Sequence, residues 1–299
     1  MRDWIDAAGQ VGGLGAADLN FPDHFAAYDA KQMAGFLEGA GLALNGVAMR
    51  YYTDPGFKLG AFTHPDREVR ETAIDITKRG ADTCAGMGGK TVTLWMGQDG
   101  FDYAFQMDYA AAWDRTVAAI SEVCAHNPDL DIAIEYKPNE PRAFALMPDI
   151  GTTLLACKEV AAPNLGVTLD FAHVLYADEM PAHSAALIGR HSRMIGLHLN
   201  DGYGKRDDGL MVGSVHAIQT VELLVAMLRM NQTDVIYFDT FPDMGGLNPI
   251  EEARTNVVLT DRLMGVAEAL ADDAELTAAI ERQDAALSHR LVARALFGA

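Results

Sequence analysis

The stretch Asp131-Ile132-Ala133-Ile134-Glu135-Tyr136-Lys137-Pro138 points to both the fold and the site. Its small and β-branched residues lie between an Asp and a Pro, which predicts a short buried strand. Glu135 and Lys137 stand two residues apart, so they point to the same side of that strand. A buried carboxylate beside a buried ammonium is costly unless another group shares the charge. A metal ion and an oxygen-rich substrate would share it, so the end of this strand is the first candidate site.

Further segments have the composition of short strands, and predicted helices alternate with them. The predicted strands cover residues 16–20, 41–52, 89–96, 131–136, 165–170, 194–199 and 235–239. The predicted helices cover residues 28–39, 63–79, 109–126, 149–160, about 171–190 and 215–230, and helices fill the chain from residue 249. Strands that alternate with helices predict parallel strands joined by right-handed crossovers.

Residues capable of chemistry stand at the carboxyl ends of these strands, which favours an α/β fold of the (β/α)₈ TIM-barrel type. They are Asn20, Trp95, Glu135, Asp170, His198 and Asp239. In a closed barrel such ends converge on one mouth, whereas an open sheet offers a single crevice. Seven strands are convincing where the barrel needs eight, so the first strand is either replaced by an N-terminal segment or missing. We expect one domain over residues 1–299, with the barrel over 13–265 and a helical extension over 266–299.

The composition excludes several classes of partner. The net charge of -19 argues against nucleic acid and against an anionic membrane surface. Three widely spaced cysteines suggest reduced thiols and a cytoplasmic location. The first residues are charged, unlike a signal peptide, and no apolar run reaches the ~18 residues of a membrane span. A small neutral molecule such as a sugar remains compatible with this charge.

Four of the strand-end residues predict a metal site. Glu135, Asp170, His198 and Asp239 are each the last inward residue of successive strands. Three carboxylates and an imidazole form a hard, oxygen-rich site for Mn²⁺, Mg²⁺ or Co²⁺, with Zn²⁺ as a further candidate. A single strand-end acid is more often a cap or a loop hydrogen bond, but four in succession are not independent accidents.

A second ion is expected beside the first. His173 lies one turn beyond Asp170, and Asp207 and Asp208 lie in the loop after His198. These residues could hold a second ion with one carboxylate bridging, although charged loops are usually solvated. Two ions would clamp adjacent oxygens of a polyol and activate a bound water. The expected cofactor is therefore one or two divalent ions.

The sequence resembles the xylose isomerase-like barrel superfamily of sugar isomerases and epimerases. The resemblance rests on Glu-x-Lys at 135–137, Asp-x-x-His at 170–173, His-x-Asn-Asp at 198–201 and the late Asp239. Their order and spacing are most similar to those of the bacterial L-rhamnose isomerases. The resemblance runs from about Asn20 into the C-terminal helices, and the motifs are specific only in combination.

The resemblance implies residue roles. Positions 135, 170, 198 and 239 would hold a structural metal, and His173 with Asp207 a catalytic metal. Lys137 would contact the substrate O1 and Trp95 would line the pocket. The catalytic residues are then Lys137, Asp207 and Glu135, and the substrate-binding residues are Trp95, Lys137, His173 and Asn20.

The implied reaction is aldose–ketose isomerisation by a metal-assisted 1,2-hydride shift, carried out by a dimer or tetramer. At position 20 such isomerases usually carry a histidine that assists ring opening. Asn20 cannot act as an acid or base, so a short sugar that does not cyclise in the usual way is one hypothesis.

Three alternatives stay open. A ketose 3-epimerase of the same superfamily would pair two glutamates across one metal, and here the second position is Asp239. A metal-dependent endonuclease on the same fold would need a histidine-rich three-metal site and a basic face, which the net charge of -19 opposes. A non-catalytic sugar-binding barrel would show no turnover.

Overall fold

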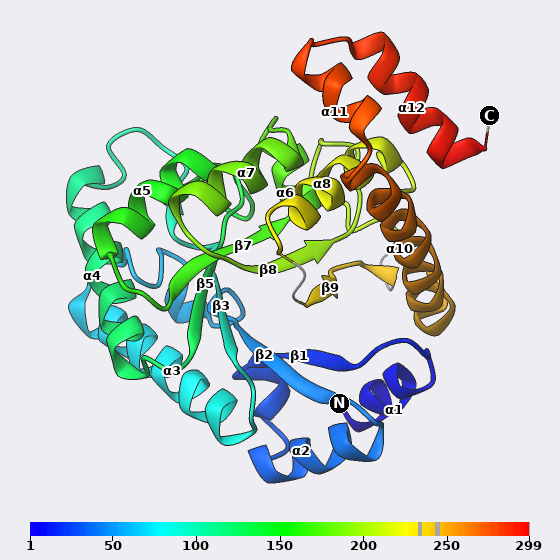
Figure 1. Ribbon diagram of the computed structural model, residues 1–299. Coiled ribbons are helices and arrows are strands. Elements are labelled where there is room, and N and C mark those ends of the chain that lie inside the picture. Colours follow the sequence, from blue (N-terminus) through cyan, green and yellow to red (C-terminus); the bar gives the residue numbers. More distant parts are fainter. Residues whose placement is uncertain (233–234, 243–245, 299) are drawn as a thin grey trace.

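The computed structural model describes residues 1–232, 235–242 and 246–298. Its main sheet has seven strands in the order β1-β2-β3-β5-β7-β8-β9, and every neighbouring pair is parallel. The strands are β1 (Ala16–Phe21), β2 (Ala43–Met49), β3 (Thr91–Trp95), β5 (Asp131–Glu135), β7 (Leu165–Asp170), β8 (Met194–Leu199) and β9 (Ile236–Phe238). The sheet curls into a nearly closed barrel (Figure 1), which confirms the expected fold class. Within the described residues, β1 and β9 do not pair with each other.

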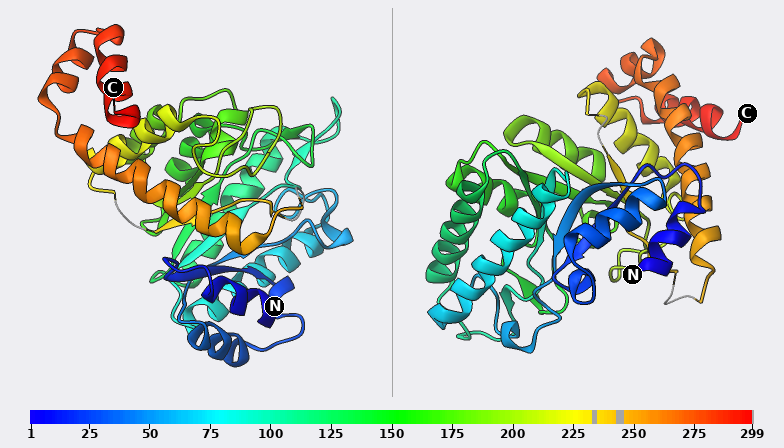
Figure 2. Two further views of the ribbon diagram at one scale, coloured as in Figure 1. Left: turned by 90° about the vertical axis from the view of Figure 1, so that its right-hand side faces the viewer. Right: turned by 90° about the horizontal axis from the view of Figure 1, so that it is seen from below.

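Helices surround this sheet (Figures 1 and 2). They are α1 (Arg2–Gly9), α2 (Ala30–Gly39), α3 (Arg67–Gly86), α4 (Tyr109–His126), α5 (Ile150–Val160), α6 (Phe171–Tyr176), α7 (Pro181–His191), α8 (Ala217–Arg229), α10 (Pro249–Ala271), α11 (Ala274–Glu281) and α12 (Ala285–Phe297). A short antiparallel ladder pairs β4 (Gly100–Phe101) with β6 (Phe144–Ala145). Several helices begin at an aspartate whose side chain accepts a backbone N–H, as at Asp29, Asp66, Asp108 and Asp149. Many of the acidic residues therefore have a structural role.

The helix expected over residues 171–190 is two helices instead. The first ends after Tyr176, and Asp178 then adopts a left-handed backbone conformation with φ of 59°. Pro181 occupies the first turn of α7, where its missing N–H costs no hydrogen bond. The break limits α6 to Phe171–Tyr176.

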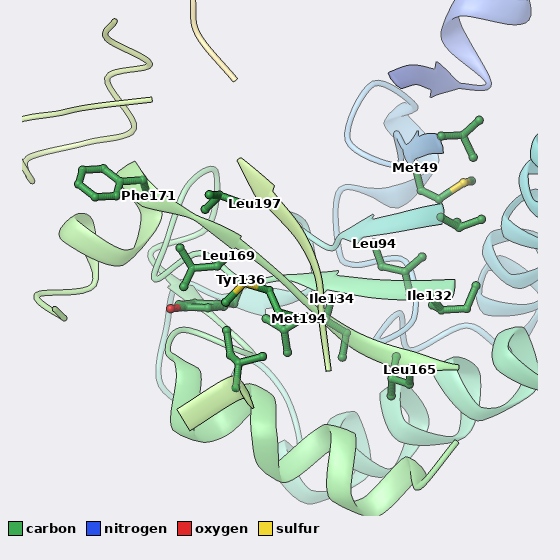
Figure 3. Close-up of a cluster of buried hydrophobic side chains, with 14 of the residues drawn as sticks. Met49, Leu94, Ile132, Ile134, Tyr136, Leu165, Leu169, Phe171, Met194 and Leu197 are labelled. Carbon is green, nitrogen blue, oxygen red and sulfur yellow. The ribbon is translucent and has the colours of Figure 1, made fainter. Parts of the chain in front are cut away.

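Alternation along the strands separates the hydrophobic core from the site. Leu94, Ile134, Leu169 and Leu197 are fully buried between the sheet and the helices (Figure 3). Their neighbours along the chain, such as Trp95 and Glu135, point to the opposite face because successive side chains alternate. The apolar face therefore fixes the register and leaves the strand ends free for polar side chains.

The last helices extend away from the barrel. Helix α10 packs against α8, and α11 and α12 then project from its end (Figures 1 and 2). The boundary expected near residue 266 falls inside α10. Among the described residues, no helix is both long and apolar enough to cross a bilayer.

Candidate active site

Four side chains from four strand ends meet at the mouth of the barrel. Glu135 ends β5, and Asp170 ends β7. His198 is the penultimate residue of β8, and Asp239 directly follows β9. One potential ligand atom from each residue lies within 4.8 Å of the other three. The structure therefore brings together the four residues on which the predicted metal site depends.

The His198 imidazole lies at a spacing from its neighbours that is typical of metal ligands. Its Nδ1 lies 3.5 Å from Glu135 Oε1, 3.7 Å from Asp170 Oδ2 and 3.7 Å from Asp239 Oδ2. This nitrogen is buried yet forms no hydrogen bond, although buried polar atoms are normally satisfied. Two ligands that each lie ~2.1 Å from one ion are about 3 to 4 Å apart, depending on the angle. The distances of 3.5 to 3.7 Å match those between ligands of a shared ion. Ligand atoms as far apart as 4.8 Å would need to move slightly closer to bind the same ion.

Asn200 supports the cluster from behind. Its Nδ2 donates to both carboxylate oxygens of Asp170, at 3.2 and 3.1 Å, and to the Asp239 carbonyl at 3.0 Å. Its Oδ1 accepts the Ala172 N–H at 2.8 Å. Such outer contacts orient the carboxylates that bind a metal. Asn200 is the Asn of the His-x-Asn-Asp motif, so that motif joins the candidate ligand His198 to the residue that supports the cluster.

A second group lies against the first. His173 Nε2 is 3.2 Å from Asp207 Oδ2, and Lys137 Nζ donates to the same oxygen at 3.1 Å. Lys137 also pairs with Glu140 at 3.0 Å. His173 Nδ1 is buried without a hydrogen bond and lies 3.5 Å from Glu135 Oε1. Glu135 thus contacts both groups, but among the described residues only its cluster with Asp170, His198 and Asp239 brings three or more potential ligands within 4.8 Å of one another, so a second ion at His173 and Asp207 stays a prediction.

The charges of the two groups compensate one another. Burial alone would lower the pKa of His198, but the charges of Glu135 and Asp239 hold that pKa well above its usual range. Burial is likewise overcome at His173, where neighbouring carboxylates raise the pKa to about 9. Burial would raise the pKa of Asp207, but its contact with the His173 imidazolium lowers the pKa to about 2. Metal ligands must be deprotonated, so a bound cation would replace the proton of an imidazolium.

Two predicted residues make other contacts. Asp208 Oδ2 accepts the Tyr203 N–H at 2.8 Å, and Oδ1 accepts from Arg206 Nε at 2.8 Å, so this carboxylate stabilises its own loop. Asn20 contacts His24 twice, through its backbone N–H at 3.0 Å and its side-chain amide at 3.2 Å. The structure therefore places Asp207, and not Asp208, in the second group.

An aromatic wall, formed by Tyr52 and Trp95, flanks the second group. The two rings meet edge to face with centroids 4.8 Å apart. Lys137 Nζ lies 5.3 Å from the Trp95 ring, and the Arg50 guanidinium lies 5.0 Å from the Tyr52 ring. Trp95, Glu135 and Lys137 line one cavity of about 20 Å³. Arg50 and Tyr52 were absent from the sequence-based site. Their spacing of two residues at the end of a predicted strand was the available signal.

A larger cleft of about 510 Å³ lies at the seam between the edge strands of the barrel. Its lining includes Ala17 and Leu19 of β1 and Tyr237 and Phe238 of β9. The ring of Tyr237 lies 4.7 Å from that of His198, so the cleft reaches the edge of the cluster.

Several solved structures share this fold. A D-tagatose 3-epimerase-like protein superposes with a TM-score of 0.72 at 16% identity, covering 85% of this chain and 90% of its own. A D-allulose 3-epimerase from Methylomonas sp. gives 0.69 at 14% identity, with coverage of 87% and 90%. A xylose isomerase domain protein from Alicyclobacillus acidocaldarius subsp. acidocaldarius gives 0.65 at 17% identity, with coverage of 90% and 94%. At these identities the likeness shows the fold.

Membership of a family rests on the sequence itself. The family profile described as a xylose isomerase-like TIM barrel matches residues 5–257, which span every strand of the sheet and every residue of the two groups. The chain thus belongs to the xylose isomerase-like TIM barrel family.

Proposed function

We propose that this protein is a divalent-metal-dependent enzyme that interconverts isomeric sugars. The observation that carries the proposal is the cluster of Glu135, Asp170, His198 and Asp239, with four ligand atoms within 4.8 Å and the His198 Nδ1 left without a hydrogen bond. A bound divalent cation would supply Lewis-acid polarisation of a sugar oxygen. The protein's own residues would then position the sugar and move its protons.

The reaction favoured by the comparisons is epimerisation at C3 of a ketose. Proteins that share the fold of this chain are named a D-tagatose 3-epimerase-like protein, a D-allulose 3-epimerase and an L-ribulose 3-epimerase. Such a reaction needs one group to remove the C3 proton and another to return a proton to the opposite face. Glu135 and Asp239 offer two carboxylates that reach the cluster from strands separated by β7 and β8. Asp239 is the shorter of the two by one methylene group.

The second group favours another reaction, aldose–ketose isomerisation by a 1,2-hydride shift. Lys137 is buried at the site and could donate to O1 as negative charge develops there. Asp207, held between Lys137 and His173, could carry the hydroxyl proton between O1 and O2. Trp95 would exclude water from the migrating hydride. Proton exchange at C3 alone gives Lys137 no such role.

The test is incubation of the Mn²⁺-loaded protein in D₂O with aldoses and ketoses of four to six carbons, as free sugars, sugar acids and sugar phosphates, followed by NMR. Epimerisation predicts deuterium at C3 of the product, whereas a hydride shift predicts aldose–ketose interconversion with little deuterium. Both predict that EDTA stops the reaction and that Mn²⁺ restores it. Absence of any interconversion across the panel by metal-loaded protein would refute the proposal. The oligomeric state and the cytoplasmic location stay predictions from the sequence.

A further inference from the structure

Arg50 stands at the mouth of the barrel on the same level as the metal cluster. It directly follows β2, and its backbone N–H donates to the Phe21 carbonyl at 2.8 Å, which continues the β1–β2 ladder. Ala48 pairs with Thr93, so Arg50 lies two residues further along, level with Trp95. Trp95 in turn pairs with Glu135. Arg50 therefore belongs to the row of strand-end residues that face the site.

Arg50 contacts an aromatic side chain of the mouth, and its charge affects the pKa of two further residues. Its guanidinium stacks on Tyr52, which contacts Trp95. Burial and nearby carboxylates raise the pKa of Tyr237, and the Arg50 charge opposes that rise. Burial and then the Arg50 charge lower the pKa of His24 to about 4, so this imidazole is neutral at pH 7 and adds no cation.

Among the residues that the structure describes, Arg50 has no acidic partner, unlike Lys137 and Arg142. Lys137 holds Asp207, and Arg142 holds Asp102 at 2.9 Å. By contrast, the Arg50 side chain forms no ion pair or hydrogen bond with any residue in the described ranges, and its contact is the face of Tyr52. A chain with 42 acidic and 23 basic residues has ample carboxylates to pair it. Arg50 is half-buried and its guanidinium lies over the Tyr52 ring, which leaves its N–H donors available to bind an anion.

We propose that Arg50 binds an anionic group, a carboxylate or a phosphate, at the end of the sugar remote from the metal. The substrate is then a sugar acid or a sugar phosphate. The aromatic wall of Tyr52 and Trp95 has Lys137 at one end, next to the metal cluster, and Arg50 at the other. A sugar lying along this wall would place its reacting carbons by the cluster and its far end by Arg50. This inference rests on the proposed function and adds the class of sugar.

Binding to unreactive probes tests the inference without requiring turnover. Isothermal titration of the Mn²⁺-loaded protein would use xylitol, xylonate and xylitol 5-phosphate, which share a carbon skeleton and differ in charge. At least one anion is expected to bind about tenfold or more tightly than xylitol, as charge-assisted hydrogen bonds predict. The tighter of the two anions identifies the source as a carboxylate or a phosphate. Equal binding of all three probes, or binding of neither anion, would overturn the inference.

Two variants distinguish a specific role of Arg50 in anion binding from a general effect of positive charge. Arg50→Gln should lose the preference for the anion while its Mn²⁺ content is unchanged, and the unchanged metal content also shows that it folds. Lys205→Gln removes one exposed positive charge from the loop that carries Asp207 and should keep the preference. A preference that survives in Arg50→Gln overturns the assignment, for instance if the xylonate carboxylate binds the metal instead.

The two proposals fail in different ways. Interconversion of neutral sugars without any preference for an anion refutes the role of Arg50 and leaves the proposed function intact. Anion binding that depends on Arg50, with no interconversion of any sugar, refutes the proposed function and supports the anion site.

Discussion

Two histidines with carboxylate neighbours, His198 and His216, differ in the distance from the imidazole nitrogen to the carboxylate oxygens. At the first, His198 Nδ1 stays 3.5 to 3.7 Å from three carboxylates and forms no hydrogen bond. At the second, Asp201 Oδ1 lies 2.8 Å from His216 Nδ1. The other oxygen of Asp201 accepts the N–H groups of Val215 and His216, each at 2.8 Å. Asp201 is three residues from His198, in the same His-x-Asn-Asp motif.

The difference teaches that residue type does not by itself identify a metal site. The Asp201 pair is closed, because its oxygens are satisfied by direct hydrogen bonds that fix the start of α8. The His198 cluster is open, because its groups surround a common point at separations suited to ligands and too long for hydrogen bonds. The predictions below test this contrast in order of their expected effect on turnover.

The largest effect is expected from removing a charge that both groups share. Glu135→Gln should lower Mn²⁺ affinity by more than about 100-fold, the upper end of the cost of losing an outer contact, and should abolish sugar interconversion. Metal analysis and turnover measure the two effects. Asp131→Asn is the matched control, because it removes a carboxylate from the other end of β5, where Asp131 pairs with Arg193 on the surface. Equal loss in both variants would contradict a local role for Glu135.

A large effect on turnover without loss of metal is expected at Lys137. Lys137→Met should lower kcat by about 10²- to 10³-fold, the cost of removing one preorganised donor, while Mn²⁺ content stays at the wild-type level. Lys90→Met, at an exposed position before β3, should change neither quantity. If Lys137→Met lost its metal instead, the lysine would belong to the support of the cluster.

An intermediate effect is expected from the support behind the ligands. Asn200→Leu removes the donors to Asp170 and Asp239 and should weaken Mn²⁺ binding by about 10- to 100-fold. Turnover should recover when Mn²⁺ is raised in proportion. A variant with normal affinity would show that the carboxylates need no such orientation.

The smallest effect on turnover is expected at the closed pair. Asp201→Asn leaves backbone N–H groups without their carboxylate and should lower the free energy of unfolding by about 1 to 3 kcal/mol. Mn²⁺ affinity and kcat should stay within twofold of wild type. Denaturant unfolding measures the stability, and a metal titration with a turnover assay measures the other two quantities. Loss of Mn²⁺ binding in this variant would contradict the difference between the two pairs.

The grouping of the four candidate ligands was predictable from the sequence because their positions follow from local rules. Alternation along a strand sets which side chains face inward, and parallel topology brings the carboxyl ends to one edge. Glu135, Asp170 and His198 each follow a recognisable apolar run, and Asp239 follows a shorter one. These four residues could therefore be grouped without predicting the conformation of any loop.

The remaining features depend on contacts that only the folded chain shows. Asp207 and Asp208 are adjacent, and the choice between them is made by Arg206 and the Tyr203 N–H, which hold Asp208. Arg50 is notable because it has no ion-pair partner within the described part of the chain, which no sequence pattern reveals. The break between α6 and α7 lies at Asp178, which adopts a left-handed backbone conformation. Pro181 alone does not fix the position of the break in the sequence.

The most direct test of the central claim is an anomalous-difference map, collected near the manganese absorption edge from crystals grown with Mn²⁺. The account predicts a peak about 2.0 to 2.3 Å from ligand atoms of Glu135, Asp170, His198 and Asp239, as for hard divalent cations. A saturated crystal with no peak among these four side chains, or with its manganese bound elsewhere, would contradict it.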